Sequence, residues 1–273
     1  MARQVGRGDR GRAPRAPQDD GRVACAIGNR LLGLGPDSRM AGASRPMVTP
    51  ELLSWLAGAL DLDGHGHLLE LGGGLGGSAA WAASRLDRPV LLVDPRTPVV
   101  EVARALFPGL HAAAATPDQL PLADGSCRAA WVLDALDDLA DGFGALQELR
   151  RVVRPGGMVG VLALVAVGGR SREAREAADG RWSEPELVDM CQLAGLRMRH
   201  QVDAAALAGT PTSWRLVQAE VRAHLERGAA EGDELLAGAL RQHRLVERQL
   251  QARLLLPRVY LAEVVARPRR RSP

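Results

Sequence analysis

The sequence predicts an α/β protein with a doubly wound, mostly parallel seven-stranded sheet. A short apolar segment at 67–71 runs into a glycine-rich turn and then into an alanine-rich helix. A second apolar segment at 89–94 follows that helix and ends in an acid, Asp94. Apolar strands and amphipathic helices then continue to alternate along the chain, which is typical of a parallel sheet. The third, fourth and fifth predicted strands are 110–114, 127–136 and 158–165. The range 127–136 includes the residues by which the chain leaves the fourth strand.

The glycine-rich turn after the first strand is predicted to bind a ligand. Glycine lets such a turn adopt positive φ and lets a ligand approach bare backbone, and the amides that open the next helix present a partial positive charge. Gly72, Gly74 and Gly77 satisfy GxGxxG, which is a weak signal for a dinucleotide site. Glu70 precedes the turn, and its carboxylate would repel a pyrophosphate but attract an ammonium group. The pair of features therefore favours an amino-acid-like cofactor.

Asp94, at the end of the second strand, is placed to accept hydrogen bonds from ribose hydroxyls. That diol is common to NAD and S-adenosylmethionine. Asp94 therefore supports an adenosine cofactor without choosing between them.

The rest of the chain divides by composition into six parts. An Arg/Gly/Pro-rich tail, predicted to be disordered, precedes a helical segment in which Thr49 caps a helix and Pro50 takes its first position. The sheet domain follows, with two amphipathic helices inserted before its last strand. The predicted boundaries are tail 1–22, helical segment 23–64, core 65–203, insertion 204–256, final strand 257–266 and basic tail 267–273.

Length and composition restrict the class of protein. A chain of 273 residues, 46% hydrophobic, can bury one sizeable core. No apolar run approaches the roughly 20 residues of a membrane span, and the start lacks a secretory apolar region, so we expect a cytoplasmic protein without membrane association. A net charge of +3 with few aromatics argues against nucleic-acid binding. The three cysteines show no metal-ligand spacing, so no metal is expected.

Two later motifs carry a family resemblance. LPLADGS at 120–126 and LQELRRVVRPGG at 146–157 flank the fourth strand. Together with the acid and GxGxG formed by Glu70, Gly72, Gly74 and Gly76, they resemble the small-molecule branch of the class I S-adenosylmethionine-dependent methyltransferases, the type 11 methyltransferase domain, over about 65–166. The resemblance implies a Rossmann-like methyltransferase fold whose last strand is antiparallel, with S-adenosylmethionine as the cofactor.

The resemblance also implies roles for individual residues. Glu70 and the turn backbone would hold the methionine part of the cofactor, Asp94 the ribose and Pro95 the adenine. The full implied cofactor set is Glu70, Gly72, Gly73, Gly74, Gly76, Asp94, Pro95, Thr116, Pro117 and Leu133.

One position of that set departs from the family. Thr116 stands where the family usually has an acid that binds the adenine amino group. A hydroxyl is uncharged, so weaker cofactor binding is expected. Asp118 is the substitute if the loop shifts.

The predicted function is methyl transfer to a small-molecule acceptor at an O, N or C atom by in-line displacement, where positioning supplies most of the acceleration. No motif identifies a base; Asp134 and Asp137, after the fourth strand, are the candidates. The resemblance makes segment 23–64 a lid, with plain packing as the alternative, and makes the insertion 204–256 a substrate cap.

Two other functions stay open at this stage. A catalytically silent methyltransferase-like module would bind a partner without turnover. A NAD-dependent oxidoreductase would need a catalytic Tyr or Lys, and the only tyrosine is Tyr260. The expected partner is the small-molecule acceptor, with a homodimer as the open alternative to a monomer.

Overall fold

The computed structural model describes most of the chain. Of the predicted tail 1–22, the structure describes only Gly21 and Arg22, and Arg22 already begins helix α1 (Arg22–Leu31). None of the predicted tail 267–273 is described. The remainder of both tails lies outside the described residues. The described residues are 21–62, 65–86, 88–169, 171, 173, 176, 178–207 and 209–266.

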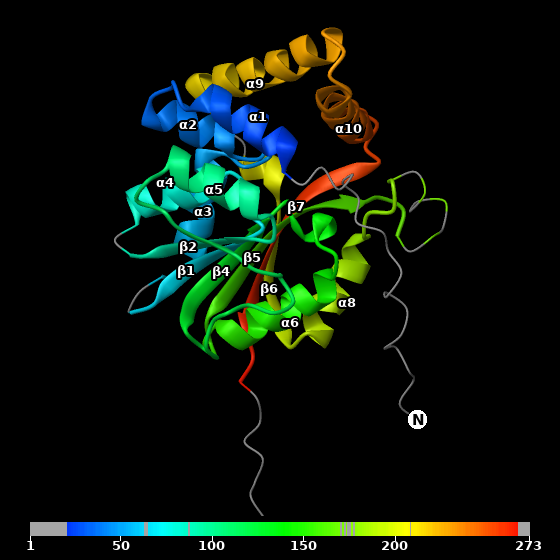
Figure 1. The fold of residues 1–273 in the computed structure, drawn as a ribbon. Coiled ribbons are helices and arrows are strands. Elements are labelled where there is room, and N and C mark those ends of the chain that lie inside the picture. The colour runs from blue at the N-terminus through cyan, green and yellow to red at the C-terminus, as the bar shows by residue number, and fades with distance from the viewer. Residues whose placement is uncertain are drawn as a thin grey trace, which may run out of the picture.

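A seven-stranded sheet in the order β3-β2-β1-β4-β5-β7-β6 forms the centre of the molecule (Figure 1). β7 is antiparallel to both of its neighbours, while the other neighbouring strands pair in parallel. The strand order reverses between β1 and β4, so the predicted doubly wound fold class is confirmed. The strands are β1 (His67–Leu71), β2 (Val90–Asp94), β3 (His111–Ala114), β4 (Cys127–Leu133), β5 (Met158–Ala166), β6 (Leu196–Asp203) and β7 (Leu255–Val264).

Helices cover both faces of the sheet, because each strand places alternate apolar side chains on opposite sides. Leu68 and Leu92 pack against α3, α4 and α5, whereas Leu69 and Val93 pack on the side of α6 and α8. On the first side lie α3 (Pro50–Ala59), α4 (Gly77–Arg85) and α5 (Thr97–Leu106), and on the second α6 (Gly142–Val152) and α8 (Glu184–Leu193).

Two helix starts follow the sequence directly. The Thr49 hydroxyl accepts a hydrogen bond from the amide of Leu52 at 3.2 Å, as the predicted N-cap requires. Ser183 and Glu186 form a reciprocal capping box at the start of α8.

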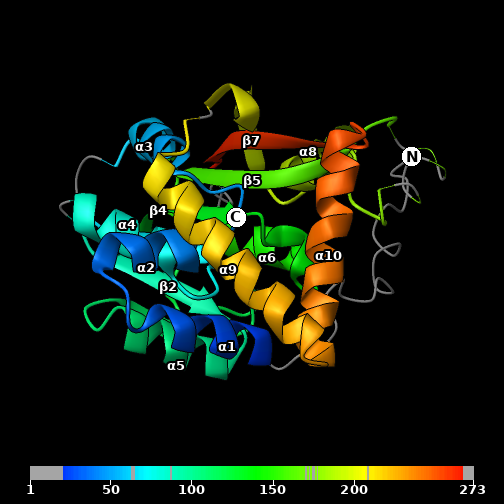
Figure 2. The ribbon, with the colours of Figure 1, turned by 90° about the horizontal axis from the view of Figure 1, so that it is seen from above.

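Four helices form a layer above the sheet: α1, α2 (Pro36–Ala43), α9 (Thr212–Ala230) and α10 (Glu234–Gln251) (Figure 1). Seen from above, α9 crosses over α2 and meets α10 at the end of a hairpin (Figure 2). Val23 and Ile27 of α1 pack with Leu225 and Leu236 of that hairpin. The hairpin lies between β6 and β7, which confirms the predicted helical insertion before the last strand.

The boundary between the insertion and the last strand differs from the prediction. α10 ends at Gln251 and β7 begins at Leu255, before the predicted start of that strand at 257. Arg253 adopts φ 54° in the turn between them, and the backbone of Leu255 pairs with Ala166. The strand begins before the predicted position because β5 extends to Ala166 and offers backbone hydrogen-bond partners to Leu255.

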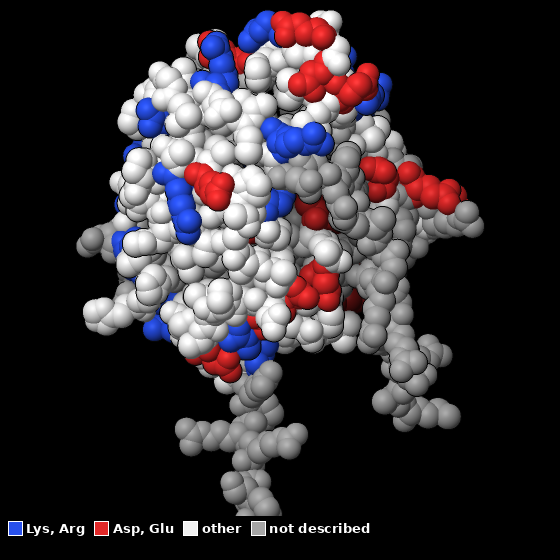
Figure 3. All heavy atoms as spheres, viewed as in Figure 1, with Lys and Arg blue, Asp and Glu red and all other residues white. Residues whose placement is uncertain are grey.

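The surface carries charges of both signs. Arginines and acids are interspersed on the face shown in Figure 3. Among the described residues, no helix has the length and apolar character that a membrane crossing requires. The described residues also include two short 3-10 helices, η1 (Leu136–Asp138) and η2 (Ala204–Leu207).

Candidate functional site

The strand-order reversal brings three predicted acids to one edge of the sheet. Glu70 lies in β1, Asp94 ends β2, and Asp134 directly follows β4. These strands are parallel neighbours around the switch point, so their carboxyl ends open on the same crevice. This edge is the candidate site.

The glycine turn between β1 and α4 has the backbone that its sequence predicts. Gly72, Gly74 and Gly76 have φ of 71°, 57° and 81°, a region that side chains disfavour. A Cβ on Gly73 would lie 2.7 Å from Cδ of Glu70, so the Glu70 carboxyl sits directly beneath the turn. At Gly74 a Cβ would meet no heavy atom within 4 Å among the described residues, so the turn faces open space there.

Gly77, the third glycine of GxGxxG, has a different role. A Cβ at Gly77 would lie 2.5 Å from the amide nitrogen of Ser44 and 2.6 Å from the carbonyl carbon of Ala43, with the Met40 carbonyl oxygen closer still. These are backbone atoms at the end of α2. Gly77 therefore permits the close packing of α2 on the first turn of α4.

Glu70 is a buried carboxyl group, 1% exposed. The Ser78 hydroxyl donates a hydrogen bond to its Oε1, whereas its Oε2 has no hydrogen-bond partner among the described residues. Burial raises the pKa of Glu70 to about 7, against the lowering effects of Ser78, the Trp131 indole and Arg45. The site thus holds a buried carboxyl group that is about half ionised near pH 7 and has no cationic partner in direct contact among the described residues.

Asp94 is equally buried but fully hydrogen-bonded. Its Oδ2 accepts from the amide of Gly74 at 3.0 Å and from Nη2 of Arg96 at 3.1 Å. Its Oδ1 accepts from the amide and from Nε of Arg96, both at 3.0 Å. Two of the four donors belong to the Arg96 side chain, which is 39% exposed and so can move away.

The residues predicted near an adenine lie at the same edge. The amide of Ala115 donates to the Asp94 carbonyl at 3.3 Å, which places the end of β3 beside that of β2. Pro95 and Thr116 are exposed, whereas Pro117 is buried. Asp118 is exposed and packs instead near Gly144 at the start of α6, since a Cβ there would lie 2.9 Å from the Asp118 Cβ.

Two arginines that the sequence did not predict enter the site. Arg45, between α2 and α3, pairs with Asp138 at 2.8 Å, and Arg181, before α8, pairs with Asp137 at 2.9 Å. The charge of Arg45 also acts on Glu70, Asp94 and Asp134, so it lies among the carboxylates of the crevice. Leu133 is buried in the core just before them.

Asp134 and Asp137, the predicted candidates for a base, therefore lie together. Asp134 adopts φ 54° at the end of β4, and its amide donates to the Leu162 carbonyl at 2.8 Å. Burial raises the pKa of Asp134 to about 6, which leaves it mostly ionised at neutral pH.

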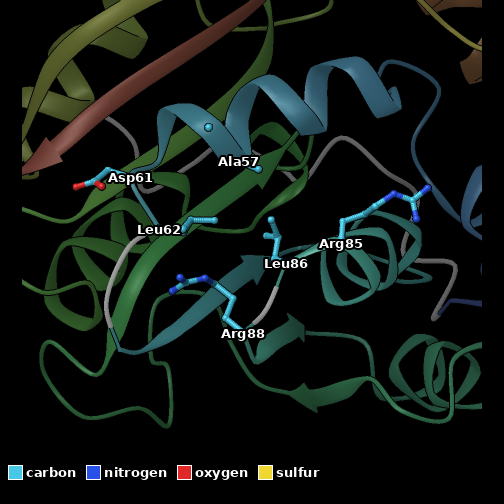
Figure 4. Close-up of a pocket in the computed structure, with 7 residues that line it drawn as sticks. Ala57, Asp61, Leu62, Arg85, Leu86 and Arg88 are labelled. Atoms are coloured by element: carbon cyan, nitrogen blue, oxygen red, sulfur yellow. The ribbon is translucent and has the colours of Figure 1, made fainter.

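A hollow elsewhere in the molecule is unrelated to this edge. Its lining residues come from the end of α3 and the end of α4 (Figure 4). Those segments lead into the amino ends of β1 and β2, opposite the glycine turn. Its one acid, Asp61, pairs with Arg128 at 3.0 Å. The lining residues are Ala57, Gly58, Asp61, Leu62, Arg85, Leu86 and Arg88.

Comparison with known proteins identifies similar sequences. Residues 69–161 match the family model described as a methyltransferase domain. An uncharacterised methyltransferase of Mycobacterium tuberculosis and one of Mycobacterium bovis are each 32% identical over 141 residues, which is 51% of this chain. The match spans about half the length of these curated relatives, 55% in each case.

Solved structures share the fold. The [4+2]-cyclase SpnF superposes with a TM-score of 0.63 at 22% identity, over 79% of this chain and 80% of its own. A putative sarcosine dimethylglycine methyltransferase from Galdieria sulphuraria gives 0.61 at 18%, over 78% and 85%. A phosphoethanolamine N-methyltransferase of Haemonchus contortus, in complex with phosphomonomethylethanolamine and S-adenosylhomocysteine, gives 0.58 at 15%, over 78% and 52%.

Proposed function

We propose that this chain, whose residues 69–161 match a methyltransferase domain, transfers a methyl group from S-adenosylmethionine to a small-molecule acceptor at an O, N or C atom. One observation carries the choice of cofactor. Beneath the glycine turn lies a buried carboxyl group, Glu70, whose Oε2 forms no hydrogen bond with a described residue, although the nearby Trp131 indole lowers the pKa of the group. An ammonium group satisfies such an oxygen, whereas a phosphate is repelled by it.

The residues of the crevice fit the other parts of the same molecule. Asp94 would receive the ribose hydroxyls once the Arg96 side chain moves, and the open space over Gly74 gives a ligand access to the turn backbone. Arg45 would pair with the carboxylate of the cofactor's methionine part, since it already lies among acids of this edge. The adenine would lie along Pro95, Thr116 and Pro117.

When bound, S-adenosylmethionine supplies a methyl group on a positively charged sulfur. The chain contributes position and charge: Glu70, Asp94 and Arg45 fix the ligand, and the buried Leu133 excludes water from the transfer end. Asp134 would take a proton from an acceptor that carries one. The lid formed by α1 and α2 and the cap formed by α9 and α10 would close the crevice over both ligands.

The first test is isothermal titration with S-adenosylmethionine, S-adenosylhomocysteine and NAD. Micromolar binding of the two adenosyl compounds and none of NAD supports the proposal. Release of S-adenosylhomocysteine during incubation with a panel of small amines, alcohols and carbon acids then identifies the acceptor class. Absence of binding by either adenosyl compound would contradict the proposal.

A catalytically silent module remains the second candidate. Thr116 supplies no charge to the adenine, and no motif in the sequence identifies a base. Cofactor binding without S-adenosylhomocysteine release across the panel would favour this candidate. An oxidoreductase is disfavoured because Tyr260 is buried in β7, where desolvation raises its pKa.

Substitution of Arg96 tests the assignment of Asp94. In Arg96→Ala we expect tighter binding of S-adenosylhomocysteine, by about three- to tenfold, because the ribose no longer displaces a partly exposed ion pair worth roughly 1 kcal/mol. Titration calorimetry measures the change. Arg104→Ala is the matched control, since Arg104 donates to the Ala112 carbonyl within the same face and touches no acid of the site. Weaker binding in Arg96→Ala would show instead that the guanidinium contacts the ligand.

The raised pKa of Glu70 predicts a pH dependence of cofactor binding. When the pH falls below the Glu70 pKa of about 7, the side chain is increasingly protonated and loses the charge that holds an ammonium group. We therefore expect affinity for S-adenosylmethionine to fall by up to tenfold for each pH unit below about 7, and to level off above it. Calorimetry across that range checks this. A flat profile would mean that Glu70 does not hold the ammonium group.

A further inference from the structure

Arg181 is a buried guanidinium shared between two aspartates. It lies just before α8, and its side chain is only 8% exposed. Nη1 lies 2.9 Å from Oδ2 of Asp137 and 3.8 Å from Oδ1 of Asp134. Its Nε is buried without a hydrogen-bond partner among the described residues. A buried charge of this kind is costly unless it is paired, so its partners are fixed by the fold.

The two aspartates use that charge unequally. Asp137 receives a direct, charge-assisted hydrogen bond from Arg181 at its Oδ2. Asp134 is beyond hydrogen-bond distance and feels the same guanidinium only through its field. Its backbone is held independently by the hydrogen bond to Leu162. Of the two, Asp134 receives no hydrogen bond from Arg181 and is the more exposed, with 14% of its side chain accessible against 7% for Asp137, so we expect an incoming ligand to meet Asp134.

We propose that Arg181 is a positioning residue that selects Asp134, rather than Asp137, as the proton acceptor of the transfer reaction. The inference rests on the proposed function and narrows its acceptor to a molecule whose methylated oxygen or nitrogen carries a proton. In that step a bond forms between the acceptor atom and the methyl carbon. The bond from that carbon to sulfur breaks with its electron pair left on sulfur, and the acceptor's proton passes to the Asp134 carboxylate.

Four charged neighbours of Asp134 enter this balance. Arg181 from the segment before α8 and Arg45 from the segment after α2 lower the pKa of Asp134, while Asp137 and Asp138 on η1 raise it. Burial is the largest influence and acts upward. Removing Arg181 and removing the charge of Asp137 should therefore move the pKa of Asp134 in opposite directions.

The test follows the side-chain carboxyl signal of Asp134 by carbon-13 NMR through a pH titration of the full chain, with Asp134→Asn used to assign the signal. In Arg181→Gln the pKa of Asp134 should rise by about one unit or more, and in Asp137→Asn it should fall by about one unit. Arg181→Lys keeps the charge and should return the pKa to within about half a unit of the wild-type value. A general loosening of the site would move both variants in the same direction.

An unchanged pKa in Arg181→Gln, or shifts of equal sign in the two variants, would overturn the proposal. If Arg181→Gln does not fold, the other two variants still test the proposal. The pKa of Asp134 must fall in Asp137→Asn and stay close to the wild-type value in Arg181→Lys. Calorimetry with S-adenosylhomocysteine on the same samples separates the two levels of inference. Loss of the predicted shifts with ligand binding intact refutes the role of Arg181 alone, whereas absence of ligand binding in the wild-type protein refutes the proposed function.

Discussion

Glu70→Gln is expected to bind S-adenosylmethionine about 30- to 100-fold more weakly than the wild-type protein, because a charge-assisted hydrogen bond contributes about 2–3 kcal/mol. The amide keeps the size of the side chain and can still accept from the Ser78 hydroxyl. What is lost is the negative charge under the glycine turn. Titration calorimetry at about pH 8, where the wild-type carboxyl is ionised, gives the largest difference.

The same variant should gain stability, which rules out misfolding as the reason for weak binding. Folding raises the pKa of Glu70 from 4.5 to about 7. Protonation of Glu70 therefore contributes to the free energy of unfolding. This contribution is fully present below about pH 4.5 and is lost as pH rises through about 7, a decrease of about 3 kcal/mol in the free energy of unfolding. Gln cannot ionise, so thermal unfolding should show Glu70→Gln to be more stable than wild type at about pH 8 and nearly equal to it at about pH 5.

A matched control is Glu148→Gln, on α6. The Glu148 carboxylate accepts from Arg151 and from the amide of Leu120, which lowers its pKa, so its stability contribution is lost as pH falls rather than as pH rises. It should lose stability near neutral pH and leave cofactor affinity unchanged. Equal affinity losses in Glu70→Gln and Glu148→Gln would show that Glu70 has no specific part in binding.

The strands and the acids at their ends could be predicted from the sequence because their signals are local. Glu70 and Asp94 each lie at the end of a short apolar run beside residues with turn chemistry, and the carboxyl ends of parallel strands must share an edge. The position of each strand and of its last residue can therefore be predicted from residues that are close to it in the sequence.

The arginines of the site could not be predicted in the same way. Arg45 reaches Asp138 across 93 positions, and Arg181 reaches Asp137 across 44. Which of many arginines becomes buried depends on how loops pack after the sheet has formed. For Arg45 a weak signal existed, since the segment before Thr49 was expected to lie over the site; for Arg181 no pattern in the sequence indicated a role.

The packing of the helices α1 and α2 above the sheet could likewise be predicted only in part, as the role of Gly77 shows. As a residue of GxGxxG it is indistinguishable in sequence from a ligand-contacting glycine, yet its missing Cβ accommodates the backbone of Ala43 and Ser44. The contact joins segments more than thirty positions apart in the sequence, so no local sequence pattern reveals it. Only the assembled structure shows that the third glycine holds the layer above the sheet.

Gly77→Ala is therefore expected to destabilise the protein by about 2–4 kcal/mol, because the added Cβ meets backbone atoms that cannot rotate away. Gly77 opens a helix and has no positive φ, so alanine brings no conformational strain of its own. Thermal unfolding and limited proteolysis within α1 and α2 measure the effect, and cofactor affinity should fall as well because Arg45 follows α2.

Gly58→Ala, in α3, is the matched control for that variant. A Cβ at Gly58 meets no heavy atom within 4 Å among the described residues, so the better helix propensity of alanine should stabilise the protein by about 0.5–1 kcal/mol. The two substitutions are chemically identical and differ only in what surrounds them. If Gly77→Ala proves as stable as Gly58→Ala, then α2 does not pack on α4 in solution, and Arg45 loses its place among the acids of the crevice.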